Sequence, residues 1–276
     1  MPLAVVRGGG DIGTACAARL SRSGLRVVVA EVAEPTAVRR TVALSEAVQD
    51  GEIRVEEIVG RLADGLEAIE ERASHPGLIW VLVDPELTRV STLNPQVVVD
   101  ARIRKRRGEG SRLPGSGLIG LGPGFTAPDD ADAVVETNRG PDLGRVIWHG
   151  SAEADTGTPG LIGGRGAERV LRAPASGRLT AILGIGALVA EGDIIASVEG
   201  RDVRAPFDGL VRGLLRSGWA VQEGMKIGDV DPRMDVELCY RMSDKALAVA
   251  GGVLEASLMI LRRQGIVLSA PASVPA

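Results

Sequence analysis

The sequence predicts an α/β protein with three parts: a Rossmann-like, doubly wound parallel sheet, a small all-β domain and a C-terminal helix. Apolar runs alternate with helical patterns as far as Asp100, which is typical of a parallel sheet. A glycine-rich turn joins the first apolar run to the first helical segment. A repeat with an offset of 32 residues follows in the second half of the chain, and its copies consist of short strand-like segments.

The stretch Leu3–Glu31 has the order of a dinucleotide-binding fingerprint: an apolar strand, a glycine turn, a helix of small residues and a second apolar strand. Gly8 suits a tight turn, Gly10 allows the backbone to approach a pyrophosphate, and Gly13 allows the helix to lie close to the strand. Asp11 adds a negative charge that fits poorly beside a pyrophosphate. The candidate binding residues of this turn are Gly8, Gly9, Gly10, Asp11, Ile12 and Gly13.

Glu31 lies 18 residues after Gly13, where an acid that binds ribose is expected. Its carboxylate would accept hydrogen bonds from ribose hydroxyls and repel a 2′-phosphate, which favours NAD-like over NADP-like ligands. The alternative is an α/β unit whose glycine-rich turn holds no ligand.

Composition excludes several classes of function for this chain of 276 residues. A net charge of -4 and a pI of about 5.4 argue against nucleic acid and against an anionic membrane as partners, and 2% aromatic residues are too few to stack on bases. Two cysteines, Cys16 and Cys239, suggest a reducing cytoplasm, and the histidines His75 and His149 form no metal motif. We expect no signal peptide, no transmembrane helix and no metal site.

The segments that follow are expected to continue the parallel sheet as far as Asp100, and two further strands are expected after it. We expect helices over Thr36–Val48 and from Ile58 to about Arg72. The expected strands are Ile53–Val55, Leu78–Val83, Val97–Asp100, Ala133–Gly140 and Gly144–Trp148.

Two segments near the carboxyl ends of these strands are candidates for ligand contact. Residues 102–107 include five basic side chains, which form either a solvated face or a contact to a phosphate. The glycine-rich segment Leu113–Phe125 has the composition of a flexible linker, but its interleaved apolar residues favour an ordered loop packed against a core or a ligand. We expect Arg102, Gly122 and Gly124 to cover a ligand in the glycine turn.

The repeat predicts a small β domain built from two interlocked copies. Arg172–Gly177 recurs as Arg204–Gly209, and the same offset relates later glycines and valines. The pattern resembles biotinyl and lipoyl carrier domains, which are barrel-sandwich hybrids. The hairpin Val198–Val203 contains no lysine, so we expect neither biotin nor lipoate and predict a scaffold or docking role.

The C-terminal part is expected to be a helix from about Asp244 to Arg263, with Ser243 as its N-cap. Gly251 and Gly252 interrupt it, and each costs about 1 kcal/mol against alanine. We therefore expect close packing of another backbone or a ligand there. The expected domains are residues 1–165 for dinucleotide binding, 166–232 for the β domain and 233–276 for the helix and tail.

Six stretches, together with the repeat, carry a resemblance that spans almost the whole chain: Gly8–Ile12, Glu34–Val42, Ile119–Phe125, Val135–Gly140, Ser243–Leu247 and Gly251–Ala256. They resemble the YqeB family, accessory proteins of the selenium-dependent molybdenum hydroxylase system. The resemblance implies a cytoplasmic helper that matures a molybdopterin-containing hydroxylase, which would be its partner. It assigns no catalytic residue.

These observations lead to one hypothesis and two alternatives. The glycine turn is predicted to bind a dinucleotide, either molybdopterin dinucleotide or NAD. Cys239 is a candidate acceptor of selenium or sulfur, or else a core residue. The alternatives are an NAD-dependent oxidoreductase, for which His149 and Tyr240 are weak candidate acids or bases, and a non-catalytic docking scaffold. The sequence leaves a homo-oligomer open.

Overall fold

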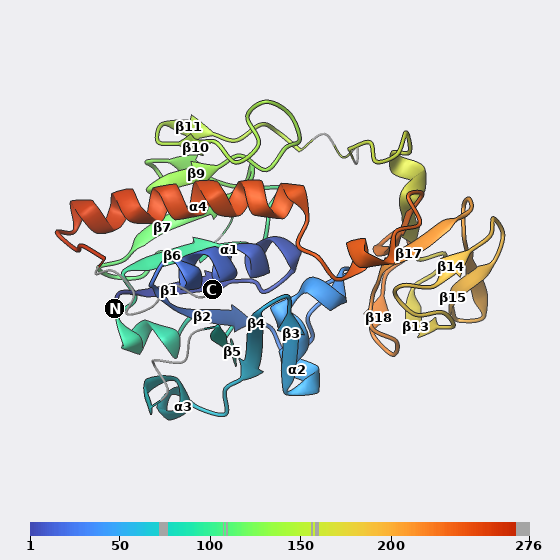
Figure 1. Ribbon diagram of the computed structural model, residues 1–276, viewed down its shortest axis with the longest axis horizontal. Helices are drawn as coiled ribbons and strands as arrows, with labels where there is room; N and C mark the ends of the chain where they lie inside the picture. The colour runs from blue at the N-terminus through green and yellow to red at the C-terminus, as the bar shows by residue number, and fades with distance from the viewer. Residues whose placement is uncertain (72–76, 107, 109, 156, 158–159, 269–276) are drawn as a thin grey trace. The chain divides into compact units, whose positions relative to one another are not determined.

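The computed structural model describes residues 1–71, 77–106, 108, 110–155, 157 and 160–268, and the chain divides into two compact units (Figure 1). Unit 1 comprises Met1–Pro35, Leu44–Asp155 and Met242–Ala276, and unit 2 comprises Thr36–Ala43 and Thr156–Arg241. The short segment Thr36–Ala43 thus groups with residues far away in sequence, and the C-terminal helix groups with the N-terminal strands.

Unit 1 is a mixed α/β structure around a nine-stranded sheet with the order β10-β9-β7-β6-β1-β2-β5-β4-β3. The strands from β9 to β4 are parallel, and the edge strands β10 and β3 are antiparallel to their neighbours. Their bounds are β1 Leu3–Arg7, β2 Arg26–Glu31, β3 Glu52–Val55, β4 Ile58–Leu62, β5 Leu78–Val83, β6 Val97–Asp100, β7 Gly117–Leu121, β9 Ala133–Val135 and β10 Val146–Ile147. A separate two-stranded sheet contains β8 (Thr126–Ala127) and β11 (Gly150–Ser151).

The order of strands reverses direction beside β1. After β1, the chain places β2, β5, β4 and β3 on one side, and then returns to place β6 and β7 on the other. Arg7 at the end of β1 is in register with Ala30 of β2 and Asp100 of β6. Ligands of open α/β sheets bind outside the carboxyl ends of strands at such a reversal.

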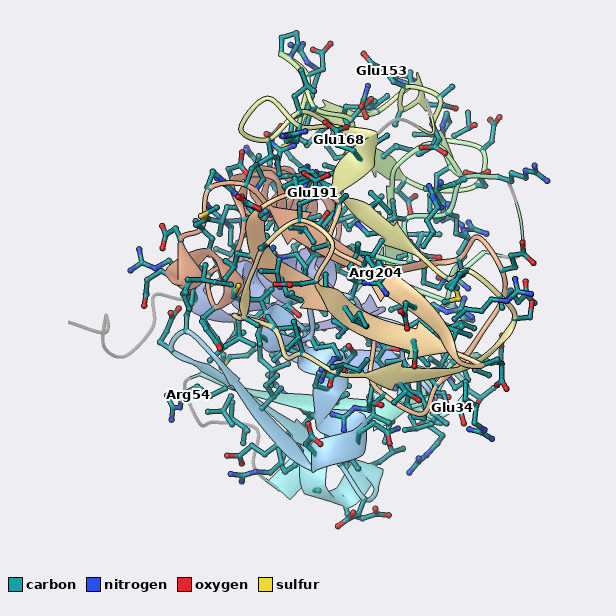
Figure 2. All side chains as sticks on the ribbon, turned by 90° about the vertical axis from the view of Figure 1, so that its right-hand side faces the viewer. Glu34, Arg54, Glu153, Glu168, Glu191 and Arg204 are labelled. Carbon is teal, nitrogen blue, oxygen red and sulfur yellow. The ribbon has the colours of Figure 1, made fainter. Side chains whose placement is uncertain are left out.

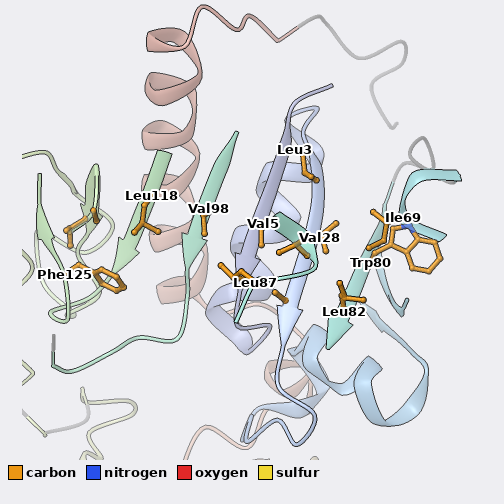
Figure 3. Packing of buried hydrophobic residues seen from close by; sticks show 14 of the residues in the cluster. Leu3, Val5, Val28, Ile69, Trp80, Leu82, Leu87, Val98, Leu118 and Phe125 are labelled. Atoms are coloured by element: carbon orange, nitrogen blue, oxygen red, sulfur yellow. The ribbon is translucent and has the colours of Figure 1, made fainter. Parts of the chain in front are cut away.

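The described residues of unit 1 form four α-helices: α1 (Asp11–Arg22), α2 (Ala47–Asp50), α3 (Leu66–Glu71) and α4 (Asp244–Arg263). The two long ones, α1 and α4, pack side by side across one face of the sheet (Figure 1). The opposite face carries a core of buried side chains, among them Val5, Leu82, Val98 and Leu118 (Figure 3). Shorter elements cover this core, because Ile69 of α3, Leu87 and Phe125 pack into it.

The prediction for the C-terminal helix is confirmed to the residue. Ser243 Oγ accepts a hydrogen bond from Ala246 N at 3.1 Å, and the helix ends at Arg263. At Gly252 a β-carbon would collide with the carbonyl oxygen of Gly144, so this glycine allows backbone to pack on backbone. A β-carbon at Gly251 would meet nothing within 4 Å.

Two predicted helices are wrong. In place of one helix over Thr36–Val48, the chain forms 3-10 turns over Arg40–Val42 and Leu44–Glu46, followed by the single turn α2. The Leu44 and Ser45 amides hydrogen-bond to Thr14 Oγ1 and Gly9 O instead of to a preceding helical turn.

The second error concerns the segment from Ile58 to Arg72, where β4 precedes the short helix α3 and Arg72 itself lies outside the described residues. Strand β4 hydrogen-bonds to β3 and β5 on its two sides, so sheet pairing outweighs the helical spacing of its apolar residues.

The glycine-rich segment contains a central strand, β7, instead of the ordered loop that we expected. Its glycines allow bulky neighbours to approach on both faces, since a β-carbon at Gly117 would collide with Ile260 of α4 and one at Gly120 with the ring of Phe125. The strand expected over Ala133–Gly140 ends at Val135.

Unit 2 contains two four-stranded antiparallel sheets, with the orders β12-β19-β17-β14 and β16-β15-β13-β18. The repeat maps strand onto strand, because adding 32 to Gly177, Leu188 and Ile194 gives the starts of β17, β18 and β19. The bounds are β12 Val170–Arg172, β13 Gly177–Ala181, β14 Leu188–Val189, β15 Ile194–Val198, β16 Arg201–Arg204, β17 Gly209–Leu214, β18 Ala220–Val221 and β19 Lys226–Asp231. Each sheet includes strands of both copies, so the copies interlock.

The hairpin that joins the two copies turns at Glu199 and Gly200. Both residues have positive φ, +48° and +75°, and Val198 pairs with Arg201, as in a two-residue type I′ turn. Charged side chains such as Glu191 and Arg204 lie on the surface of this unit (Figure 2).

Candidate functional site

The candidate site is built around the glycine turn between β1 and α1. Gly8 has φ +101°, a conformation that favours glycine, and a β-carbon at Gly13 would collide with the carbonyl oxygen of Gly8. Gly10 is the N-cap of α1, and a β-carbon there would meet nothing within 4 Å. Gly13 therefore packs tightly against Gly8, whereas the turn faces open space at Gly10.

The first turn of α1 is a place where backbone N–H groups have no partner within the helix. Asp11 Oδ1 accepts a hydrogen bond from Ile12 N at 2.9 Å, so one carboxylate already lies against this helix end. The side chains of Asp11 and Ile12 are partly exposed. The remaining N–H groups and the helix dipole would stabilise a negatively charged ligand at this position, and the negative charge of Asp11 would destabilise it.

Gly9 is hydrogen-bonded to three different segments. Its N–H donates to Glu31 Oε1 at 2.5 Å, and its carbonyl oxygen accepts from Ser45 N at 3.0 Å and from Thr14 Oγ1 at 3.0 Å. A β-carbon at Gly9 would lie 2.8 Å from Val29 Cγ1. The glycine spacing predicted that Gly9 contacts a ligand. In the structure Gly9 is buried, and its hydrogen bonds fix the shape of the turn.

Glu31 lies at the end of β2, as expected, and its carboxylate faces the turn. Besides Gly9 N, it accepts a hydrogen bond from Val32 N at 2.9 Å, and the residue is 8% exposed. Burial raises the pKa of Glu31 above its ordinary value, although the two backbone donors lower it.

Among the residues that the structure describes, Glu31 is one of four buried acids at the carboxyl ends of parallel strands. Asp84 accepts from the backbone N–H groups of Arg89 and Val90 at 2.9 and 2.8 Å. Glu136 accepts from those of Thr137, Asn138 and Glu153, each at 2.7 Å. The four acids are Glu31, Asp84, Asp100 and Glu136.

In each case the carboxylate binds backbone N–H groups of loops at this edge of the sheet. The sequence contains a sign of this arrangement, because each acid directly ends or follows an apolar run. Of the four acids, only Glu31 was predicted as a site residue.

Asp100 holds the loop after β6 beside the glycine turn. Arg102 binds it through two hydrogen bonds, Nε to Oδ1 at 3.0 Å and Nη2 to Oδ2 at 2.6 Å, and Ser111 Oγ donates to Oδ2 at 2.7 Å. Burial alone would raise the pKa of Asp100, but the donors from Arg102 and Ser111 lower it below its ordinary value. About a third of the Arg102 side chain is exposed (34%).

Arg7, at the end of β1, is a buried cation that sequence analysis missed. Its guanidinium donates to Ser111 Oγ at 3.0 Å and contacts Glu86 Oε2 at 3.3 Å. Burial and the neighbouring Arg102 lower the pKa of Arg7. The first strand therefore ends in a positive charge next to the turn.

Gly122 and Gly124 lie at this edge too, but they pack against protein. A β-carbon at Gly124 would lie 2.6 Å from the carbonyl oxygen of Arg104, and one at Gly122 would lie 3.0 Å from Thr137 Oγ1. The guanidinium of Arg104 lies over the ring of Phe125, 4.1 Å from its centroid. These glycines thus allow the loop after β7 to pack closely against neighbouring loops. Arg107, the last of the five basic residues, lies outside the described residues.

Both cysteines are buried. Burial raises the pKa of Cys16, in α1, to about 12. Cys239 belongs to unit 2, where its Sγ lies 3.8 Å from the carbonyl oxygen of Val211 and burial raises its pKa. A raised pKa reduces the thiolate fraction at neutral pH, which weighs against an acceptor role for Cys239.

The remaining candidates lie apart from the turn in the chain. His149 in unit 1 is exposed, Tyr240 in unit 2 is 49% exposed, and His75 lies outside the described residues. Within the described ranges, no three His, Cys, Asp or Glu residues are grouped as a metal site would require. Nor does any described helix combine the length and the hydrophobicity needed to cross a membrane.

Comparison with known proteins finds one strong sequence match. The chain is 47% identical over 265 residues to the uncharacterized protein YqeB of Escherichia coli (strain K12), covering 96% of this chain and 48% of that protein. The chain therefore spans about half the length of the curated relative that it matches. No family model matches the chain.

Among solved structures, an aspartoacylase family protein of Mesorhizobium loti shares 11% identity with a TM-score of 0.22, covering 83% of this chain and 51% of that one. The ectoine utilization protein EutE (DoeB) of Ruegeria pomeroyi, with product bound, shares 14% identity with a TM-score of 0.24, covering 83% and 85%. These likenesses are too weak to support an argument about fold or function.

Proposed function

We propose that this chain belongs to the YqeB family and binds a dinucleotide at the carboxyl edge of its large sheet, as a cytoplasmic helper in the maturation of a selenium-dependent molybdenum hydroxylase. The observation that carries the binding proposal is the glycine turn, which opens at Gly10 beside the point where the strand order reverses. The hydroxylase part rests on the family resemblance.

Three features of the edge match the parts of a dinucleotide. The N-terminal turn of α1 offers backbone N–H groups to the pyrophosphate, the Glu31 carboxylate offers acceptors to a ribose, and Arg102 offers a cation from the loop after β6. Each carboxylate oxygen can accept two hydrogen bonds, so Glu31 keeps acceptor capacity beyond its bonds to Gly9 and Val32.

The negative charge of Glu31 favours a ligand without a 2′-phosphate. NAD and molybdopterin dinucleotide both satisfy that condition, and both present a pyrophosphate. We propose binding without turnover, because no acid–base pair accompanies the turn among the residues that sequence analysis selected.

The test is calorimetric titration of NAD into the wild-type chain and two variants. Gly10→Asp places a carboxylate in the open part of the turn, where its β-carbon has room, so we expect a folded protein whose affinity for NAD falls by about tenfold or more. Gly184→Asp is the matched control, because Gly184 in unit 2 also faces open space.

NADP is expected to bind more weakly than NAD to the wild-type chain. Equal affinity of wild type and Gly10→Asp for NAD would contradict the assignment of the turn.

A further inference from the structure

The segment Thr36–Ala43, which we call the strap, is flanked in the chain by residues that hydrogen-bond to the glycine turn and to α1. On its N-terminal side, Glu31 and its hydrogen bond to Gly9 N precede the strap by a few residues. On its C-terminal side, Ser45 N donates to Gly9 O at 3.0 Å and Leu44 N donates to Thr14 Oγ1 at 2.9 Å. One residue of the turn, Gly9, thus fixes both flanks of the strap.

The strap itself is hydrogen-bonded within unit 2. Leu214 N donates to Val38 O at 2.8 Å, and Arg40 Nε donates to Leu214 O at 2.8 Å. Arg39 Nη2 donates to the carbonyl oxygens of Leu238 and Arg241, each at 3.0 Å.

The surface of β17 that contacts the strap is specific to the second copy of the repeat. A β-carbon at Gly213 would lie 2.9 Å from Val38 Cγ1 and 3.0 Å from Val38 O, so a side chain there would prevent docking. The residue that corresponds to Gly213 in the first copy, 32 positions earlier, is Ala181. The repeat has therefore diverged at the position where the strap docks.

We infer that occupancy of the glycine turn and docking of the strap on β17 are thermodynamically coupled, an inference that rests on the proposed dinucleotide site. Glu31 and Ser45 hold Gly9 in the geometry that the turn needs, and the same chain segment is held by unit 2 through Val38, Arg39 and Arg40. A ligand that requires this geometry of the turn stabilises the docked strap, and by linkage the docked strap strengthens binding.

Hydrogen exchange with and without saturating NAD tests the coupling. The Leu214 amide reports docking directly because it donates to Val38 O, and the Ala43 amide reports the end of the strap because it donates to Arg40 O. We expect NAD to slow exchange in the peptides that contain these amides by about fivefold or more. Binding of NAD with unchanged exchange at both would overturn the coupling and leave the dinucleotide site intact, whereas no binding of NAD at all would overturn both.

A variant of the strap tests the reverse direction. Arg39→Ala removes two hydrogen bonds of the strap and is expected to raise the Kd for NAD by about fivefold or more. Arg172→Ala is the control, because Arg172 Nη1 also donates to a carbonyl oxygen in unit 2, that of Gly224 at 2.9 Å, without touching the strap. A Kd for Arg39→Ala within about twofold of the wild type, or an equal loss of affinity in both variants, would overturn the inference.

Discussion

The glycines of the first turn perform different tasks, which are visible residue by residue. Gly8 adopts a positive φ, Gly13 allows the helix to touch the end of β1, and Gly9 hydrogen-bonds to Glu31, Ser45 and Thr14. Gly10 alone among them faces open space. The spacing of the glycines predicted the roles of Gly8 and Gly13, but the role of Gly9 depends on residues distant in sequence.

The carboxylate of Asp100, a single residue, is predicted to make the free energy of unfolding depend on pH. Asp100→Asn removes the charged acceptor of Arg102 and Ser111, and we expect it to lower the free energy of unfolding at pH 7 by about 1–3 kcal/mol. The pKa of Asp100 is lower in the folded than in the unfolded chain, so the folded state binds fewer protons and this stability is present above the ordinary pKa of the carboxyl. It is lost as pH falls through the lower, folded-state pKa.

Urea unfolding of wild type and variant at pH 7 and at about pH 3 measures both parts of the prediction. The control is Asp202→Asn, whose carboxylate pairs with Arg204 at the surface and should contribute little. A difference between wild type and Asp100→Asn that grows on acidification would contradict the account.

At the scale of elements, α4 shows what sequence patterns predict well. Its cap, its length and its buried face follow from local chemistry: Ser243 binds the first turn, and apolar residues recur at helical spacing. The strands that end in Glu31 and Asp100 were equally clear, because they are continuous apolar runs. The failures at Thr36–Val48 and β4 arose where distant partners, Gly9, Thr14 and the flanking strands, compete with local preference.

The two adjacent glycines of α4 should respond oppositely to alanine. Gly251→Ala is expected to stabilise the chain by about 1 kcal/mol, since its β-carbon meets nothing and alanine favours the helix. Gly252→Ala is expected to destabilise it by about 1–3 kcal/mol, because the β-carbon collides with Gly144 O. Thermal unfolding measures both variants, and each serves as the control for the other. A higher Tm for Gly252→Ala than for Gly251→Ala would contradict the packing of Gly252 against Gly144.

At the scale of the whole molecule, the repeat predicted the interlocked β structure of unit 2, because each copy preserves its turns and apolar positions. The sequence did not predict that Thr36–Ala43 belongs to that unit. Its pairing with β17 joins residues more than 170 positions apart through backbone atoms, which leave no periodic pattern.

The candidate site was predicted in part. Sequence analysis found the turn, Glu31 and Arg102, which the structure brings to one edge of the sheet. It missed Arg7, whose burial depends on Ser111 and Glu86 from later loops. The glycine-rich segment also predicted ligand contacts for Gly122 and Gly124, and the structure shows that both pack against neighbouring loops.

The central claim, that a pyrophosphate lies at the glycine turn, is tested most directly by phosphorus NMR of NAD titrated with the chain. The account predicts that the pyrophosphate resonances shift or broaden with the wild type and with Gly184→Asp, and that Gly10→Asp must be about tenfold or more concentrated to cause the same change. Unchanged resonances with the wild type, or the same change at equal concentrations of wild type and Gly10→Asp, would contradict it.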